Sequence, residues 1–342
     1  MLQRELNVFW RHILTCAAVC STLLTSACSP LPRQQASDPV RRSQPLLGTF
    51  VVITVYAPSN AQAHSAINAT FDEIRRVDLV FSIHRPDSEL SRVNATPGPA
   101  IVSDELLKVL GRALEIARET NGAFDPTVGP LVELWGFLWK EHRFPTSSEL
   151  AATLPRVNHR FVEVDPRERT VGFHTNSVSL DLNAIAKGYA VDCAIEKLRS
   201  FGITNAMVRA GGDLRVIGSP PGEGAWTVQL EDPTKTGRRM VIKLRDRALS
   251  TSGSYENFFI RCGKRYSHIL DPRTGFPVEG IASCSVIAPT CMESDAWSTA
   301  LFVLGPGRAL KEFGPRMPVL FGTWTADGDV GFGRSPSFPP VD

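Results

Sequence analysis

Hydrophobic and polar positions alternate along the chain with two different periods, which predict both helices and strands. Apolar residues recur at three- and four-residue spacing over residues 61–81 and 103–121, a pattern typical of amphipathic helices. The β-rich run 51–56 and the alternating segments 226–230 and 240–244 favour strands, the last two paired around a polar turn. We therefore expect an α+β fold of mostly antiparallel sheets with helices packed outside, in one compact unit or two closely joined lobes.

Three further segments extend this pattern. Residues 161–173 predict a hairpin with its turn at Asp165-Pro166, and residues 206–218 predict a strand interrupted by Gly211-Gly212. A polar cluster followed by apolar positions predicts another helix that begins near Ser294. With many Gly and Pro residues at turns, the chain fits an α+β protein better than a helical bundle.

The N-terminal segment differs in composition from the rest. Two arginines precede an apolar run, residues 13–24, which ends in small residues followed by Cys28. This order resembles a bacterial lipoprotein signal in which Cys28 becomes the lipidated first residue, and the run is short for a transmembrane span. Simple secretion and an uncleaved anchor are the alternatives. We expect residues 1–27 to be a signal peptide and residues 28–43, rich in Pro, Gln, Ser and Arg, a flexible tether.

Residues 44–333 are expected to form the folded domain, and the Pro- and Ser-rich residues 334–342 a disordered tail. The chain has 342 residues and 43% hydrophobic content, enough for one large core or two modest ones. Its 37 basic residues nearly balance its 35 acidic residues, and no basic stripe occurs, so nucleic acid is not an expected partner.

Four cysteines follow the leader, at positions 193, 262, 284 and 291. They form no C-x-x-C pair, which argues against a zinc site, and their number is not that of a disulfide scaffold. Spacing alone leaves a bridge between Cys284 and Cys291 open.

Residues 181–192, with the sequence DLNAIAKGYAVD, bring a carboxylate, backbone groups and Lys187 together. Residues 178–182 alternate like a strand, and Asn183 is a suitable N-cap for the helix that follows. A helix N-terminus with a lysine in its first turns suits a phosphate group. The same residues are also typical of a capped amphipathic helix with a solvated lysine.

Asp295 and Thr299 are four residues apart in the helix expected near Ser294, and hence lie on one face. A carboxylate and a hydroxyl with this spacing can both reach one hard cation, which prefers oxygen ligands. Glu293 is a neighbouring acidic alternative. Without further context, this segment is equally a capped helix.

Residues 181–192 resemble the D-L-x-x-I-A-K-G-Y-A-x-D motif of the bacterial FAD:protein FMN transferases. Residues 122–131, GAFDPTVGPL, resemble another long motif of that family, and residues 268–275 resemble its H-I-x-D-P-x-T-G segment. Residues 294–300 are similar to its A-D-A-x-x-T-A segment, with Ser294 in place of the first Ala. The likeness extends over residues 44–333.

The resemblance implies a site for FAD and Mg²⁺. The implied FAD contacts are Leu47, His84, Ala123, Phe124, Asp125, Asp181, Lys187 and Ile269. The implied magnesium ligands are Asp295, Thr299 and the backbone carbonyl of Ala184, and the implied catalytic residues are His268 as proton acceptor and Lys187 as a second positive group. Leu47 and His84 stand where the family usually has Met and Tyr.

This resemblance implies magnesium-dependent transfer of the FMN part of FAD to a threonine hydroxyl of a client protein, with AMP leaving. The family's clients include subunits of the sodium-pumping NADH:quinone oxidoreductase and of related electron-transfer complexes. A lipid anchor at Cys28 would hold such an enzyme on the periplasmic side of the cell membrane. Two alternatives fit the same residues: a magnesium-dependent FAD pyrophosphatase that yields FMN and AMP, and a periplasmic FAD carrier without transfer activity.

Overall fold

The computed structural model describes residues 38–342 apart from Asn176. The expected signal peptide, Cys28 and most of the expected tether therefore lie outside the described residues.

An eight-stranded sheet lies at the centre of the described part, and all its neighbouring strands are antiparallel. In spatial order the strands are β1 (Val40–Leu46), β2 (Thr49–Tyr56), β6 (Asn205–Ala210), β7 (Asp213–Ile217), β10 (Ala248–Gly253), β13 (Ile281–Ala288), β14 (Val319–Trp324) and β15 (Val330–Arg334). The prediction of one strand interrupted by Gly211-Gly212 is wrong, because this pair turns the chain between two strands, β6 and β7. Gly211 has a φ of +59°, which a two-residue hairpin turn favours and a side chain disfavours.

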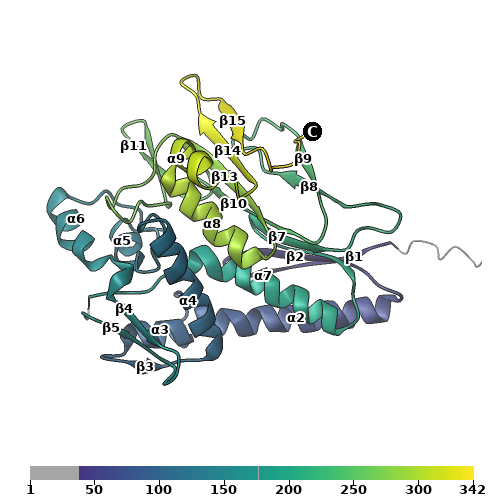
Figure 1. Cartoon of the computed structure of the whole chain (residues 1–342), viewed down its shortest axis with the longest axis horizontal. Helices are drawn as coiled ribbons and strands as arrows, with labels where there is room; N and C mark the ends of the chain where they lie inside the picture. The colour runs from purple at the N-terminus through teal and green to yellow at the C-terminus, as the bar shows by residue number, and fades with distance from the viewer. Residues whose placement is uncertain (1–37, 176) are drawn as a thin grey trace, which may run out of the picture. The chain divides into compact units, whose positions relative to one another are not determined.

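Three long helices pack on one face of this sheet: α2 (Asn60–Phe81), α7 (Asn183–Ser200) and α8 (Cys291–Leu304) (Figure 1). Helix α2 begins where the Ser59 hydroxyl accepts a hydrogen bond from the Gln62 amide, and it buries the apolar stripe that its sequence predicts. That stripe and apolar residues of α7 form one core cluster with β2 and β6. The predicted α+β fold, with helices outside mostly antiparallel strands, is confirmed.

The opposite face of β7, β10, β13 and β14 is covered by a two-stranded ribbon, β8 (Trp226–Leu230) and β9 (Met240–Leu244), as the alternation predicts. The C-terminal segment joins the same cluster: Phe338 is 1% exposed, and Asp342 exchanges backbone hydrogen bonds with Val241. The expectation of a disordered tail is therefore wrong, because one buried aromatic ring and strand-like pairing hold a segment whose composition is that of a loop.

Residues 40–43 also differ from expectation. They belong to β1, which pairs with β2 along its whole length, so these four residues are part of the sheet and not of a tether. Backbone pairing overrides their polar composition, since an edge strand leaves alternate side chains in solvent.

A second group of elements adjoins the N-terminal end of α7. It contains α3 (Glu89–Ala95), α4 (Asp104–Glu119), α5 (Gly129–Leu134), α6 (Ser147–Thr153), the short 3₁₀ turns η1 (Leu154–Arg156) and η2 (His159–Phe161), and a small sheet of β3 (Ala100–Ile101), β5 (Thr170–Phe173) and β4 (Val162–Asp165). The predicted 161–173 hairpin is β4 and β5, and the predicted 103–121 helix is α4 with Ser103 as its N-cap. The remaining elements are a hairpin of β11 (Phe258–Arg261) and β12 (Lys264–Ser267), and α9 (Pro306–Glu312).

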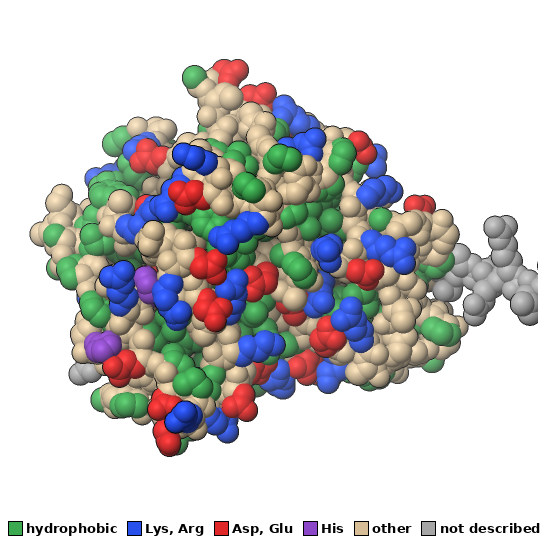
Figure 2. All heavy atoms as spheres, viewed as in Figure 1, with side chains coloured by type: hydrophobic (Ala, Val, Ile, Leu, Met, Phe, Trp, Pro, Cys, Tyr) green, Lys and Arg blue, Asp and Glu red, His purple; other side chains and the backbone are tan. Residues whose placement is uncertain are grey.

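The four cysteines within the described residues are free thiols, so Cys284 and Cys291 are not bridged. None of the helices in this part of the chain is both long and apolar enough to cross a membrane. On the face seen in Figure 2, positive and negative side chains are interspersed.

Candidate active site

The site begins with polar residues on the helix-facing side of two central strands. Successive strand residues point to opposite faces, so Leu214 of β7 packs into the cluster with β8 and β9 while Asp213 and Arg215 face α7. In β10, Ser252 likewise faces α8, where its hydroxyl lies 3.0 Å from that of Thr299. The layer between sheet and helices, apolar elsewhere, is polar here.

Helix α7 starts differently from the prediction. Residues 178–182 are not a strand, and Asn183 is the first helical residue, not the N-cap. The Asp181 carboxylate accepts the Asn183 amide hydrogen at 2.9 Å, and its own amide donates to the Pro126 carbonyl at 2.8 Å. The 122–131 loop thereby holds the start of the helix, and burial raises the pKa of Asp181 although the Asn183 amide opposes the shift.

Lys187 lies one turn into α7 and points between two carboxylates. Its Nζ is 3.2 Å from Asp213 Oδ2 and 3.7 Å from Asp295 Oδ1, and it donates to the Asn183 carbonyl at 3.2 Å. Burial lowers the pKa of Lys187, but Asp213 and then Asp295 outweigh it and raise this pKa above its usual range. The ammonium therefore stays charged, and the two acids hold it in place.

Asp295 is 3% exposed and accepts the Gly188 amide hydrogen at 2.8 Å through Oδ2. Burial and the nearby Asp213 raise its pKa, against the opposing charge of Lys187. Because Asp213 and Asp295 share the one ammonium of Lys187, a further cation would stabilise the charged form of Asp295.

Gly188 lets α7 and α8 approach closely. A Cβ at this position would lie 2.2 Å from the Cys291 carbonyl oxygen and 2.7 Å from Asp295 Cβ. Asp192, one turn further along α7, accepts the amide hydrogens of Cys291 and Met292 at 2.8 and 2.9 Å. This carboxylate, with Thr290 as N-cap, starts α8 at Cys291, three residues before the predicted Ser294.

The implied magnesium ligands fit a hard cation. In a regular helix the backbone amide of Gly188 points toward the carbonyl of Ala184, four residues earlier. The hydrogen bond from the Gly188 amide to Asp295 therefore places the Asp295 carboxylate beside the turn of α7 that carries Ala184. Thr299 follows Asp295 by one turn of α8, and together the three residues offer only oxygen ligands, as Mg²⁺ prefers. Within residues 38–342, Asn176 aside, no group of three His, Cys, Asp or Glu residues offers a competing metal site.

The 122–131 loop is buried, and its acidic residue is occupied internally. Ala123, Phe124 and Asp125 are at most 7% exposed. Asp125 Oδ1 accepts from the Thr127 amide and hydroxyl at 2.9 and 2.6 Å, and Oδ2 accepts from the His159 amide at 2.9 Å. The Asp125 side chain thus fixes the shape of the loop.

The two positions that depart from the family's usual residues lie at different places. Leu47, in the β1–β2 turn, has a φ of +56° and packs against both large core clusters. His84 is exposed, and its ring lies edge-to-face with Trp139 at a centroid distance of 5.6 Å.

His268 ends the hairpin of β11 and β12, and its Nδ1 lies 3.1 Å from the Asn257 carbonyl oxygen. That contact places a hydrogen on Nδ1 and leaves Nε2 as the proton acceptor. Burial, with a smaller contribution from the charge of Lys187, lowers the pKa of His268 to about 4. Ile269, the next residue, is buried.

Asp213 and Ser252 belong to this site, but the sequence analysis did not single them out as site residues. A Gly-Gly-Asp turn and a Ser/Thr/Gly run are common in loops and bulges. The signal that marks Asp213 is alternation: it occupies a strand position whose neighbour Leu214 is also buried, so its polar side chain has no solvent to face. Ser252 is only partly buried, and no such signal marks it.

The fold is shared with solved flavin transferases. It superposes on the structure of the flavin transferase ApbE from Vibrio cholerae with a TM-score of 0.79 and 34% identity, over 88% of this chain and 98% of that one. The ApbE protein from Thermotoga maritima gives the same TM-score and coverage at 33% identity.

Residues 47–320 match the sequence model of the ApbE family, and the chain belongs to this family. Among curated relatives, a protein of Treponema pallidum named FAD:protein FMN transferase is 33% identical over 336 residues, which cover 92% of this chain and 91% of the relative.

Proposed function

We propose that this protein is an FAD:protein FMN transferase, which attaches the FMN part of FAD to a threonine hydroxyl of a client protein and releases AMP. The observation that carries this proposal is Lys187, held between the buried carboxylates of Asp213 and Asp295 at the start of α7, in a chain of the ApbE family. The reaction breaks the phosphoanhydride of FAD and forms a phosphoester on the acceptor oxygen, so it depends on positioning and on charge neutralisation.

Asp295, Thr299 and the Ala184 carbonyl would hold a magnesium ion, which supplies positive charge to the two phosphates when bound. Lys187 contributes a second positive group beside them. His268 accepts the hydroxyl proton through Nε2, because its lowered pKa keeps the ring neutral at physiological pH. Asp181, Leu47, His84, Ile269 and residues 123–125 would form the walls of the FAD pocket.

The proposal is tested with the mature protein, FAD, Mg²⁺ and a flavin-accepting domain of a sodium-pumping NADH:quinone oxidoreductase. A mass gain of one FMN on the acceptor, with one AMP released per transfer, is the expected result. Release of FMN and AMP without modified acceptor would instead identify an FAD pyrophosphatase. Unchanged FAD would identify a carrier and refute the transferase.

His268 makes stability depend on pH. The unfolded histidine takes up its proton near pH 6.5 and the folded one only near pH 4, so stabilisation is complete above pH 6.5 and is lost as the pH falls toward 4. Across this interval we expect the free energy of unfolding of wild type to fall by at most about 3 kcal/mol more than that of His268→Gln. Urea unfolding between pH 8 and pH 4 measures the difference, with exposed His64→Gln as control. If the free energies of unfolding of wild type and His268→Gln changed with pH in parallel, the pKa of His268 in the folded protein would not be lowered, contrary to this prediction.

The lipid anchor also belongs to this proposal, with the enzyme on the periplasmic side of the cell membrane. Its support is the leader sequence that ends at Cys28. Cys28→Ser is expected to move the protein from the membrane fraction to the soluble fraction of cells. Retention of the variant in membranes would point to an uncleaved anchor.

A further inference from the structure

A row of hydroxyl groups joins strand β10 to helix α8 beside the proposed magnesium ligands. The Ser298 hydroxyl donates its hydrogen to the backbone carbonyl of Asp295 at 2.9 Å. The Ser252 hydroxyl lies 2.8 Å from that of Ser298 and 3.0 Å from that of Thr299. Three hydroxyls and one carbonyl thus form a continuous chain of hydrogen bonds with Thr299 at its end.

The direction of this whole chain follows from its carbonyl end, because each hydroxyl has only one hydrogen to donate. A carbonyl can only accept, so the Ser298 hydrogen is used at Asp295, and the Ser252 hydroxyl must donate to Ser298. The Ser252 hydrogen is then used as well. The hydrogen bond between Ser252 and Thr299 therefore forms only with Thr299 as the donor.

This direction leaves the lone pairs of the Thr299 oxygen free. Ser252 is the hydrogen-bond partner of the Thr299 hydroxyl within the part of the chain that the structure describes. A cation is bound through a lone pair of a hydroxyl oxygen, so the hydrogen must point elsewhere. Ser298 is 1% exposed and Thr299 is half-buried, so the chain starts in the interior and ends at a group that solvent can reach.

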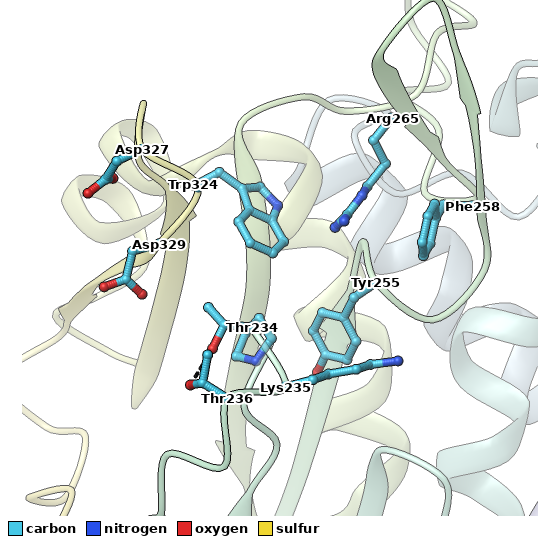
Figure 3. A pocket seen from close by; sticks show the side chains of 11 residues that line it. Thr234, Lys235, Thr236, Tyr255, Phe258, Arg265, Trp324, Asp327 and Asp329 are labelled. Atoms are coloured by element: carbon cyan, nitrogen blue, oxygen red, sulfur yellow. Dashed lines mark hydrogen bonds between the residues drawn. The ribbon is translucent and has the colours of Figure 1, made fainter.

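A cavity of about 510 Å³ adjoins the segment after β10 but does not include this chain of hydroxyls. Tyr255 and Phe258 line it, and Arg265 points between the rings of Phe258 and Trp324, at 4.4 and 4.8 Å from their centroids (Figure 3). None of the described residues that line it is a proposed magnesium ligand or a partner of one. Ser252 therefore acts on the helix-facing side of β10 and not through this cavity.

We propose that Ser252 is a positioning residue of the transferase: its hydroxyl accepts the Thr299 hydrogen and so leaves the lone pairs of the Thr299 oxygen for the magnesium ion. This inference rests on the proposed function, because it concerns the metal site of the same reaction. Ser252 acts through Thr299 and is not itself a ligand. A partner that orients a metal ligand is typically worth about tenfold to a hundredfold in metal affinity.

A second pair of hydroxyls, one turn earlier in α8, supplies a matched control. Ser250 of β10 and Ser294 of α8 have hydroxyls 2.8 Å apart, and the Ser294 hydroxyl donates to the Cys291 carbonyl at 3.1 Å. Within the described residues neither serine has a hydrogen bond to the Thr299 hydroxyl. Ser250→Ala therefore removes a hydrogen bond of the same kind and length between the same two elements, and leaves that of Thr299 in place.

The test measures binding of Mn²⁺ alone to the full protein, followed by the electron paramagnetic resonance signal of the free ion, with Mg²⁺ as competitor. We expect Ser252→Ala to weaken the binding of both ions by about tenfold to a hundredfold, and Ser250→Ala to bind them like wild type. Asp295→Ala should abolish this binding and so identifies the site. With FAD and acceptor, Ser252→Ala should need more Mg²⁺ but reach nearly the wild-type kcat at saturation, since only the orientation of a ligand is lost.

The outcomes separate this inference from the proposed function. Wild-type affinity in Ser252→Ala, an equal loss in Ser250→Ala, or a kcat that stays low at saturating Mg²⁺ overturns the role of Ser252, while the metal site and the transferase stand. A loss of affinity confined to Ser252→Ala and relieved by Mg²⁺ supports it. Absence of Mn²⁺ binding by wild type, or wild-type binding by Asp295→Ala, would show that the metal assignment is wrong, and this inference with it. Failure of the transferase would appear separately, as unmodified acceptor domain with wild type.

Discussion

Replacement of Asp295 by Ala is expected to lower the rate of FMN transfer by about a hundredfold to a thousandfold, the cost of removing one preorganised charge-stabilising group. This carboxylate is buried, lies 3.7 Å from Lys187 and receives the Gly188 amide hydrogen, so no solvent group can replace it. Without it the proposed magnesium ion keeps only neutral oxygen ligands, Thr299 and the Ala184 carbonyl. The measurement is kcat with saturating FAD across a series of Mg²⁺ concentrations.

The fold should survive this substitution, because Lys187 keeps its ion pair with Asp213 at 3.2 Å. Thermal unfolding checks this point. Asp295→Asn separates loss of charge from loss of volume, and we expect it to be nearly as inactive as Asp295→Ala. Asp72→Ala, which removes a surface carboxylate paired with Arg75, is the control and should transfer FMN normally. Transfer by Asp295→Ala at the wild-type rate would show that the metal assignment is wrong.

Replacement of Gly188 by Ala is expected to destabilise the protein by about 3 kcal/mol, near the upper end for overpacking a core. The added Cβ would lie 2.2 Å from a backbone oxygen of α8, which cannot rotate away as a side chain can. The two helices must separate, and Asp295 then loses its bond to the Gly188 amide. Stability and transfer activity should therefore fall together.

The matched control is Gly111→Ala in the middle of α4. A Cβ at Gly111 meets no atom within 4 Å, so the intrinsic helix preference for Ala should stabilise the protein by about 0.5 to 1 kcal/mol. Thermal and urea unfolding of both variants measure the contrast. If Gly188→Ala unfolds like wild type, the close approach of α7 and α8 is not required for folding.

Patterns local in the chain predicted much of this structure. The Ser103 cap, the alternating strands β8 and β9, and the four-residue spacing of Asp295 and Thr299 each depend on residues near one another, and the structure places all three as predicted. Predictions failed where distant groups decide. Asp192 starts α8 earlier than the α8 sequence indicates, and Phe338 anchors a tail whose composition resembles disorder.

The residues of the candidate site fall into the same two groups, those predicted from local motifs and those that depend on contacts between distant parts of the chain. The sequence located Lys187, Asp295, Thr299 and His268 through motifs that each span about a dozen residues or fewer. It did not identify Asp213 as the partner of Lys187, because the two residues are 26 positions apart. It also did not place Arg265 between two rings, since one of them, Trp324, is 59 positions away. Such pairs depend on which face of a strand meets which helix or turn.

The sequence by itself determined the secondary structure of most segments, the fold class and the motifs of the family, because hydrophobic period, capping and spacing act over a few residues. Only the tertiary structure decided that two acids share one lysine, that Gly188 sets the helix distance, and that a ring-held arginine lines a cavity beside the site. The physical reason is that charge pairing and close packing depend on atoms brought together by the sheet and not by the chain.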